Sequence, residues 1–413
     1  MIIAGTHSGV GKTSVALAIL QQAQRQGIRL APFKAGPDFL DPFWLAAAAG
    51  RPCRQLDAWM QNDAGMRAQL AQSQDPPLIE GVMGLFDGPN GGATAQIACA
   101  TGLVVALVVD ASGMAESIAA IAQGFARHDP DLRFVGVIAN RVGGKTHAAI
   151  LARALQDAGL KLLGWMDAEA PRIPERHLGL APPARALPPL GAHLHLDEAF
   201  WSLCKPARIK APAQSASRML QGVRVAVARD AALGFIYQGN LDWLAEEGAD
   251  IRFFSPLAGE DLPSADALWL PGGYPELFAA ELSRSPTLRA IAEAIRGGMP
   301  ALAECGGMMI LGEAIVDADG RGFPMAGVLP ARFVMRRRLV ALGYRAWPHR
   351  GETLRGHEFH YADRQMRAPL PSAFAGIEGD SGVRIHRLWA SFQHWWFASA
   401  PRFFARLFRG ACR

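Results

Sequence analysis

A chain of 413 residues, half of them apolar and 19% charged, has enough apolar material for two large cores, which excludes a disordered or fibrous protein. The net charge of +5 comes without long runs of lysine or arginine, so nucleic acid is disfavoured as a partner and an acidic small molecule fits the charge. The five cysteines form no CxxC pair, which argues against a zinc site and a disulfide framework and favours a reducing cytoplasm.

The first motif is a phosphate-binding loop at residues 5–13, GTHSGVGKT. Four apolar residues precede it and an apolar, helix-forming run follows it, which is the strand–loop–helix context of a nucleoside triphosphate site. The strict pattern has glycine where this chain has Thr6. Lys12 would reach the outer phosphates, and Thr13 would hold Mg²⁺. The residues expected to bind the nucleotide are Gly9, Val10, Gly11, Lys12, Thr13 and Ser14.

Short apolar runs alternate with helical stretches through the first half of the chain. The predicted strands lie at residues 1–4, 29–34, 78–80, 103–109, 134–139 and 162–165. The predicted helices lie at residues 12–26, 93–100, 115–126 and 146–158. This order indicates a parallel sheet covered on both faces, whose ligands bind beyond the carboxyl ends of the strands.

Acidic residues follow two of these strands at the edge where ligands bind. We expect Thr13, Glu80 and Asp38 to contact Mg²⁺, directly or through water. Asp41 could position metal or substrate, or it could cap a helix, because Pro42 follows it at a favourable first-turn position.

The composition of the chain changes between residues 168 and 221, where prolines and isolated arginines are frequent around a predicted helix at 196–204. We therefore predict a first domain at residues 1–204, a linker at 205–221 and a second domain at 222–413. In the second domain the predicted strands lie at 223–228, 251–254, 267–270 and 300–303, and the predicted helices at 241–247, 285–296 and 308–314. Residues 323–392 are mainly strand-like, and the aromatic, basic tail at 395–408 favours a final docked helix over a membrane-surface helix.

Cys305 lies on a predicted strand-to-helix turn, in the sequence AECGGM. A thiol at such a turn can act as a nucleophile, because the next backbone N–H and the helix dipole stabilise an oxyanion; the alternative is a buried, inert cysteine. We expect Gly306 to donate one oxyanion hydrogen bond and Gly273, in the loop at 271–276, to donate the second. A thiol also needs a base, and the sequence alone does not choose among four histidines. These are His357, His360, His386 and His394.

A metal site at His357 and His360 is conceivable, because both flank Glu358. Residues three apart face opposite sides of a strand, however. We therefore favour a structural or substrate-side role and predict no protein-ligated metal there.

Taken together, these motifs resemble the cobyrinic acid a,c-diamide synthase family, glutamine-dependent amidotransferases of cobalamin biosynthesis. The matching segments cover nearly the whole chain and are residues 5–13, 34–42, 56–60, 80–88, 136–142, 270–276, 303–307 and 355–361. The resemblance implies an α/β fold, with a parallel-sheet P-loop NTPase domain like that of dethiobiotin synthetase followed by a class I glutamine-amidotransferase-like α/β domain. The resemblance also explains Thr6, the departure from the strict loop pattern, because the family's loops share the Gly-Thr opening of dethiobiotin-synthetase-like loops.

The resemblance implies that Cys305 is the catalytic nucleophile and that His394 is the catalytic base, and it implies substrate-binding roles for Asp41 and Asp87. The family's late Ser-Tyr-Leu-His-Leu-His segment is altered in this chain. Class I glutaminases place an orienting carboxylate two residues after the base, where this chain has Trp396. The residues that depart from the family pattern are Phe392, Gln393 and Trp396.

The implied activity is that of a carbon–nitrogen ligase, which amidates the a and c acetate carboxylates of cobyrinic acid with ammonia from glutamine. ATP and Mg²⁺ are the implied cofactors, and the expected partners are small molecules (corrinoid, glutamine and ATP), without nucleic acid or membrane. A homodimer in the cytoplasm is the candidate assembly. The corrinoid carboxylates could meet some of the arginines near residue 335, each of which can also be read as a solvated surface charge. These are Arg332, Arg336, Arg337 and Arg338.

Three alternatives remain open at this point. The same reaction could act on hydrogenobyrinic acid or on nickel-sirohydrochlorin. A partitioning-type ATPase would have no use for the segment at 304–307. A non-catalytic corrinoid-binding or regulatory homologue is favoured only by the altered segment at 392–396.

Overall fold

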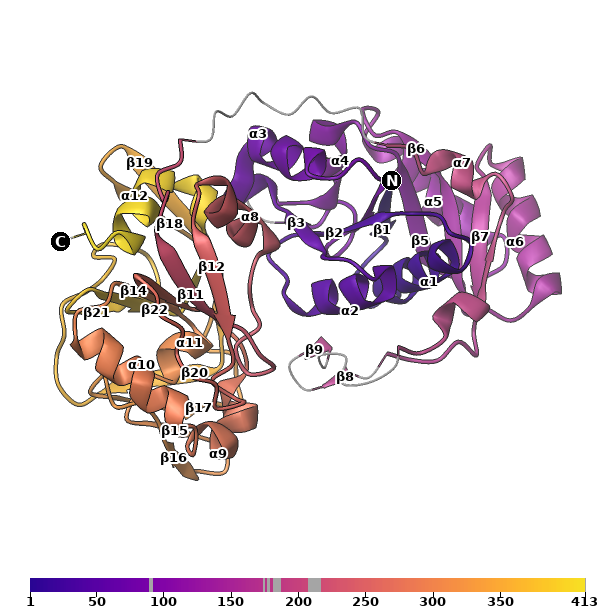
Figure 1. The fold of residues 1–413 in the computed structure, drawn as a ribbon. Coiled ribbons are helices and arrows are strands. Elements are labelled where there is room, and N and C mark those ends of the chain that lie inside the picture. Colours follow the sequence, from indigo (N-terminus) through magenta and orange to yellow (C-terminus); the bar gives the residue numbers. More distant parts are fainter. Residues whose placement is uncertain (89–91, 174, 177–178, 181–186, 207–216, 413) are drawn as a thin grey trace. The chain divides into compact units, whose positions relative to one another are not determined.

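The computed structural model describes residues 1–88, 92–173, 175–176, 179–180, 187–206 and 217–412. The chain divides into two compact units, Met1–Gln214 and Ser215–Arg413 (Figure 1). Most of the predicted linker falls outside the described residues, so the domain boundaries stay a prediction. Across the described ranges, none of the helices combines the length and the apolar composition that crossing a bilayer requires.

A largely parallel sheet forms the centre of the first unit, with its 8 strands in the order β10-β7-β6-β5-β1-β4-β2-β3. The motif-bearing strand β1 is central because its apolar residues are buried on both faces, and only β10 at the edge runs antiparallel. The strands are β1 (Ile2–Gly5), β2 (Ala31–Ala35), β3 (Arg54–Leu56), β4 (Pro77–Glu80), β5 (Val105–Asp110), β6 (Phe134–Val142), β7 (Leu162–Asp167) and β10 (Leu194–Leu196), and β8 (Glu175–Arg176) pairs separately with β9 (Gly179–Leu180).

Helices cover both faces of this sheet (Figure 1). One face carries α1 (Lys12–Arg25) and α2 (Leu40–Ala49), and the other carries α3 (Ala58–Ala71), α4 (Thr94–Thr101), α5 (Ser117–His128) and α6 (Lys145–Asp157). The predicted helices did not include α2 or α3, although the capping role weighed for Asp41 implied a helix starting near Pro42. The predicted helix at 196–204 is only partly correct, because residue 196 ends β10 and the helix α7 is confined to Phe200–Leu203.

The second unit is built on another mainly parallel sheet of 6 strands in the order β12-β11-β13-β14-β22-β21. One face packs on α8 and α12, and the other packs on α9, α10 and α11. The strands are β11 (Arg224–Ala228), β12 (Asp250–Phe254), β13 (Ala267–Leu270), β14 (Ala301–Glu304), β21 (Val383–Ile385) and β22 (Leu388–Ser391). The helices are α8 (Gln238–Glu246), α9 (Ala279–Leu282), α10 (Pro286–Arg296), α11 (Gly306–Met309) and α12 (Pro401–Phe408).

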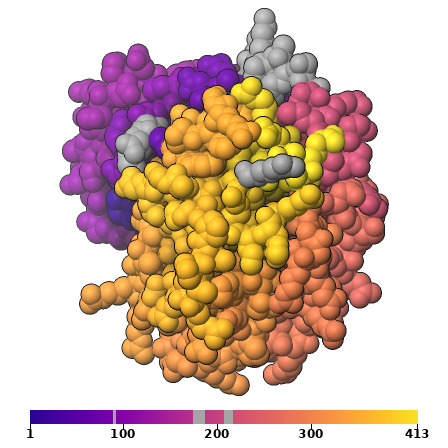
Figure 2. Space-filling view, turned by 90° about the vertical axis from the view of Figure 1, so that its left-hand side faces the viewer, coloured from indigo at the N-terminus to yellow at the C-terminus, as the bar shows by residue number. Residues whose placement is uncertain are grey.

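Two smaller sheets complete this unit, and segments far apart in the chain, coloured orange and yellow, share the face seen in Figure 2. The first sheet contains β16 (Gly322–Pro324), β15 (Ala314–Val316), β17 (Ala331–Met335) and β20 (Ala362–Met366), and the second contains β18 (Ala341–His349), β19 (Glu352–His360) and β23 (Gln393–Trp396). The predicted helix at 308–314 is wrong after residue 309, since the chain turns there and enters β15 at residue 314. The predicted final helix is present as α12 but begins only at residue 401, because residues 395–396 end β23; its phenylalanines lie in the core.

Candidate functional site

The phosphate-binding loop joins β1 to α1, at the carboxyl edge of the first sheet. Gly11 is left-handed, with φ of 98°, and a Cβ there would lie 2.1 Å from Nδ2 of Asn140. That Nδ2 donates a hydrogen bond of 2.8 Å to the carbonyl oxygen of Val10. A β6 residue to which the sequence motifs gave no role therefore fixes the shape of the loop. The predicted nucleotide residues Gly9, Val10, Gly11, Lys12, Thr13 and Ser14 form this loop and the first turn of α1.

The structure brings together Thr13, in the first turn of α1, and Glu80, at the end of β4. The Thr13 hydroxyl donates a hydrogen bond of 2.5 Å to Oε1 of Glu80. The Lys12 ammonium donates to the carbonyl oxygen of His7 at 3.3 Å. Burial and the charge of Lys34 lower the pKa of Lys12, so its ammonium lies in an environment that favours an incoming anion.

Lys34 on β2 is another residue to which the sequence motifs gave no role. Its side chain is 4% exposed, and its Nζ lies 2.6 Å from Oδ2 of Asp41 and 3.1 Å from Oε1 of Glu80. Burial alone would lower the pKa of Lys34, but the charges of Asp41 and Glu80 raise it above the usual value. Lys34 therefore links the acidic residues into one charged cluster beside the phosphate-binding loop. A lysine inside a fully buried apolar strand was the signal that could have identified it.

The start of α2 is capped by Asp38 and not by Asp41. Oδ1 of Asp38 accepts hydrogen bonds from the backbone N–H of Leu40 at 2.7 Å and of Asp41 at 3.1 Å. Asp41 lies within the first turn and is engaged by Lys34. Helix capping, one of the two roles weighed for Asp41, thus belongs to Asp38, and burial together with the charge of Asp41 raises the pKa of Asp38.

Asp87 follows β4 and closes the loop that carries it. Its Oδ2 accepts a hydrogen bond of 3.1 Å from the backbone N–H of Gly84. The charge of Asp87 also acts to raise the pKa of Lys12, so it belongs to the same electrostatic cluster. The predicted substrate residues Asp41 and Asp87 thus both act on the environment of Lys12.

The oxygen atoms at this edge fit Mg²⁺, which prefers hard oxygen ligands and keeps several positions for phosphate and water. Oε2 of Glu80 is buried and has no hydrogen-bond partner among the described residues, while its Oε1 faces Thr13. The described residues contain no cluster of three His, Cys, Asp or Glu side chains that could hold a metal by itself. The site therefore fits an ion that is held by few protein oxygens and by a nucleotide. Of the three expected contacts, Thr13 and Glu80 lie together, whereas Oδ1 of Asp38 is engaged by the backbone at the start of α2, and all three contacts stay predictions.

In the second unit, Cys305 lies on the tight turn between β14 and α11. Its backbone is left-handed, with φ of 45°, and its N–H donates to the carbonyl oxygen of Ser391 at 2.7 Å. Burial, together with the charge of Glu276, raises the pKa of the thiol to about 12. Hydrogen bonds from the backbone of Gly306 and of Gly273 act in the opposite direction, and these are the two N–H groups predicted to stabilise an oxyanion.

His394 on β23 faces Cys305 across the backbone of Gly272. A Cβ added to Gly272 would lie 2.1 Å from Cε1 of His394, 2.9 Å from its Nδ1 and 3.2 Å from Cβ of Cys305. The imidazole and the nucleophile therefore flank the same point, which is the arrangement that a general base and a thiol require.

Burial, together with the charges of His357 and His360, lowers the pKa of His394 to about 3. The imidazole is therefore neutral near pH 7 and able to accept a proton. His357 is the cross-strand neighbour of His394 in the pairing of β19 with β23. Trp396, where class I glutaminases have a carboxylate, packs its ring edge-on against Tyr237 at 5.8 Å between ring centroids.

The other candidate histidines lie in different surroundings. His360 contacts Oε1 of Glu358 at 3.0 Å through Nε2, and its ring stacks on Phe392 at 3.6 Å between centroids. His386 lies in the turn before β22, with φ of 52°. Ser391, whose carbonyl accepts from the Cys305 N–H, is at the other end of that strand. His360 is thus held by Glu358 and Phe392, and among the four candidate histidines His394 is the one seen against Gly272 beside Cys305.

Glu304 connects the three elements that carry the thiol, the histidine and the oxyanion loop. Its Oε1 accepts from the backbone N–H of Trp395, the residue after the histidine, at 2.8 Å. Its Oε2 accepts from Nε1 of Trp269 on β13 at 2.8 Å. Burial raises the pKa of Glu304 to about 8. The sequence motifs gave Glu304 no role, although a glutamate at the end of a buried apolar strand indicates a functional or hydrogen-bonded side chain.

The arginines proposed for corrinoid carboxylates lie in and after β17, at exposed positions. Arg336 forms an ion pair of 2.6 Å with Asp363. The exposed side chains beside them include Leu339 and Leu342, so apolar and basic groups share this surface. The four arginines are Arg332, Arg336, Arg337 and Arg338.

Comparison with known proteins places both units in described families. Residues 1–180 match a CobQ/CobB/MinD/ParA nucleotide binding domain, and residues 224–402 match a CobB/CobQ-like glutamine amidotransferase domain. A hydrogenobyrinate a,c-diamide synthase of Pseudomonas aeruginosa is 42% identical over 428 residues, which cover 98% of this chain and 96% of the relative. A cobyrinate a,c-diamide synthase of Herminiimonas arsenicoxydans is 36% identical over 425 residues, which cover 99% and 96%. Another, from Gloeobacter violaceus, is 42% identical over 400 residues, which cover 90% and 87%.

Proposed function

The chain belongs to the family of cobyrinate and hydrogenobyrinate a,c-diamide synthases, and from this premise we propose that it amidates the a and c acetate carboxylates of cobyrinic acid. The nitrogen comes from glutamine and the driving force from ATP. The reaction belongs to cobalamin biosynthesis. The observation that carries the proposal is the pairing of a charged phosphate-binding cluster in one unit with a Cys305–His394 pair in the other.

Activation is the task of the first unit. A carboxylate does not react with ammonia, because its oxygen is a poor leaving group, so the carboxylate oxygen first takes the γ-phosphoryl group of ATP and ADP leaves. Lys12 and the backbone N–H groups of the loop bind the phosphates and stabilise the charge on the transferring group. When bound, Mg²⁺ supplies further charge neutralisation, with Thr13 and Glu80 as its protein contacts. Lys34 holds Asp41 and Glu80 in place, which supports a binding role for Asp41.

Ammonia is produced in the second unit. His394 accepts the thiol proton as the Cys305 sulfur attacks the side-chain amide carbon of glutamine. The N–H groups of Gly306 and Gly273 stabilise the oxyanion, and the proton then passes from His394 to the departing ammonia. Water hydrolyses the resulting thioester to glutamate, and ammonia displaces phosphate from the acyl phosphate. Burial of both catalytic side chains supports a site from which water is largely excluded.

A second substrate is favoured by the comparisons. The Pseudomonas aeruginosa relative, which aligns with 98% of this chain, is named for hydrogenobyrinate, the cobalt-free corrinoid. The same residues would perform the same chemistry on it, because the a and c acetate groups are identical in the two molecules.

The decisive experiment is amidation of cobyrinic and hydrogenobyrinic acids with ATP, Mg²⁺ and either glutamine or ammonium, followed by mass spectrometry of the corrinoid. Cys305→Ser should abolish the use of glutamine and retain the use of ammonium, whereas Lys12→Ala should abolish both. Preference for one corrinoid then distinguishes the two candidate substrates. Normal use of glutamine by Cys305→Ser would overturn the assignment of the nucleophile, and failure to amidate either corrinoid would overturn the proposed substrates.

A further inference from the structure

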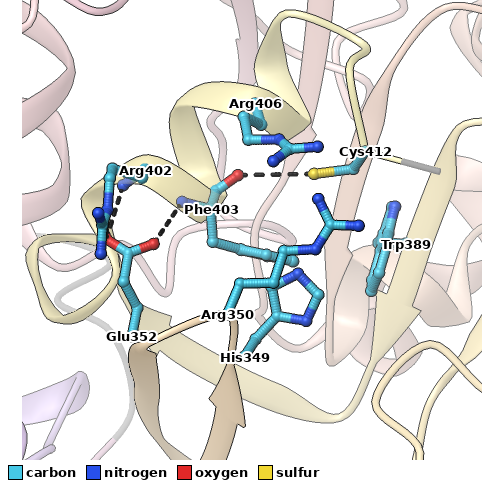
Figure 3. A pocket seen from close by; sticks show the side chains of 8 residues that line it. All are labelled: His349, Arg350, Glu352, Trp389, Arg402, Phe403, Arg406 and Cys412. Carbon is cyan, nitrogen blue, oxygen red and sulfur yellow. Dashed lines mark hydrogen bonds and ion pairs between the residues drawn. The ribbon is translucent and has the colours of Figure 1, made fainter.

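A basic pocket of about 170 Å³ lies in the second unit, apart from the Cys305–His394 pair (Figure 3). Trp389, on its wall, lies near the start of β22. Cys305 follows the end of β14, and the parallel pairing sets Ala301 beside Leu388 at one end and Glu304 beside Ser391 at the other. The pocket and the nucleophile therefore lie towards opposite ends of these strands.

Positive charges converge on this pocket. Arg350 and Arg406 line it, and their guanidinium groups reach toward the sulfur of Cys412 (Figure 3). Both act electrostatically on that thiol, as does Arg384, which lies over the Trp389 ring at 5.4 Å. The region around Cys412 thus carries three permanent charges of one sign.

Among the described residues, no acidic side chain forms an ion pair with these three arginines. Glu352 is the carboxylate in the pocket lining, and it accepts hydrogen bonds of 3.0 Å from the backbone N–H groups of Arg402 and Phe403 at the start of α12. It also forms an ion pair with the Arg402 side chain at 3.3 Å. Within the described parts of the chain, Arg350, Arg384 and Arg406 form no ion pair with a carboxylate. Like charges that are held together without a counter-charge repel one another, and a bound anion would remove this cost.

The backbone presents Arg350 at a fixed position. Arg350 and Gly351 form the two-residue turn between β18 and β19, with φ of 49° and 79°. Positive φ at both positions is the geometry of a tight hairpin turn, in which a non-glycine residue costs about 1 kcal/mol. The next residue on each side, His349 and Glu352, also lines the pocket. The turn therefore fixes the backbone from which the Arg350 side chain reaches the pocket, so little backbone freedom is lost there when a ligand binds.

We propose that this pocket binds a small oxyanion that carries at least two negative charges, namely a phosphate compound or a polycarboxylate. Guanidinium groups bind both kinds of anion through paired hydrogen bonds. The apolar wall formed by Trp389 and Phe403, which are 4% and 2% exposed, excludes water from one side of the ligand. This proposal is independent of the corrinoid substrate, because it uses none of the residues assigned to the reaction.

Cys412 provides a local reporter of binding. Its thiol lies beside Arg350 and Arg406, so an anion held by these arginines would shield it from a neutral alkylating reagent such as iodoacetamide. Peptide mass spectrometry gives the labelling rate of each cysteine separately. The exposed Cys99 in the first unit is the internal control. A local reporter is needed because phosphate also binds the loop at residues 5–13 and would shift the melting temperature of the whole protein.

Inorganic phosphate, pyrophosphate and citrate are the probes, each compared with KCl at matched ionic strength. We expect at least one of the three anions to slow the labelling of Cys412 by about 5-fold or more, with that of Cys99 unchanged, and the comparison of phosphates with citrate identifies the class of anion. Arg350→Gln combined with Arg406→Gln should remove the protection, whereas Arg289→Gln, an exposed arginine on α10, should retain it. Equal labelling with and without the three anions in the wild-type protein would overturn the proposal, as would equal protection by KCl. The wild-type result decides even if the double variant fails to fold.

Discussion

Gly272→Ala is a sharp test of the glutaminase geometry. The backbone of Gly272 does not have positive φ, so alanine adds only a methyl group and no backbone strain. That methyl would lie 2.1 Å from Cε1 of His394, where carbon atoms in contact need about 3.5 Å. The imidazole or the loop must therefore shift by about 1.4 Å, and misplacement of a catalytic group by about 1 Å can reduce a rate by about 100-fold.

We therefore expect glutamine-dependent kcat/KM to fall by about 100-fold, equivalent to about 2.7 kcal/mol of transition-state stabilisation. Ammonium-dependent amidation should change little, because the first unit is intact. The assay is glutamate release together with corrinoid amidation from each nitrogen source. Gly322→Ala is the matched control, since a Cβ at Gly322 on β16 meets no atom within 4 Å. A glutamine-dependent rate of Gly272→Ala within 3-fold of wild type would refute the placement of His394 beside Cys305.

Three further outcomes are expected. Lys34→Met should abolish amidation from both nitrogen sources and lower the melting temperature, because buried Asp41 and Glu80 lose their cation at about 3–5 kcal/mol; ammonium-dependent activity above a tenth of wild type would contradict this. Glu304→Gln replaces one of two accepting oxygens with an amide N–H, which then faces an N–H donor, at a stability loss of about 1–3 kcal/mol. Glutamine-dependent kcat/KM should therefore fall more than ammonium-dependent kcat/KM, and equal losses would argue against a positioning role. Burial lowers the pKa of His357 from 6.5 to about 4, so its contribution to stability is complete above pH 6.5 and is lost as the pH falls toward 4. His357→Asn should flatten this acid-induced loss by about 3 kcal/mol in urea titrations across that window, and an unchanged pH dependence would show that His357 is not buried in its neutral form.

Local signals in the sequence were sufficient for the family and the fold class, and both are confirmed. The loop at residues 5–13 is recognisable from its motif. The buried strands β1, β4 and β5 are recognisable from their composition, because a parallel strand is apolar on both faces. Element bounds are close for the same reason. The predicted strand at 267–270 coincides with β13, and the predicted helix at 12–26 ends one residue after α1.

Features that depend on contacts between distant residues were not predictable. Helix α2 is nearly apolar throughout and gives no amphipathic period, and α3 is interrupted at Asn62, whose φ is 55°. The choice of Asp38 over Asp41 as the cap depends on the path of the chain before α2. No local pattern shows that Lys34 meets Glu80 or that Glu304 meets Trp395. The first pair forms because β2 and β4 are neighbouring strands, and the second because β14 and β23 pack together in the fold.

The contacts of Glu304 also bear on the order in which the enzyme is made. Its two partners, Trp269 and Trp395, lie 35 positions before it and 91 positions after it. A nascent chain that already carries Cys305 and residues 271–276 still lacks β23, and with it the proposed base His394 and the hydrogen bond from the backbone of Trp395 to Glu304. From the proposed role of His394 we expect a chain truncated before β23 to release no ammonia from glutamine. Folding that waits for so distant a contact is slower than folding through local contacts.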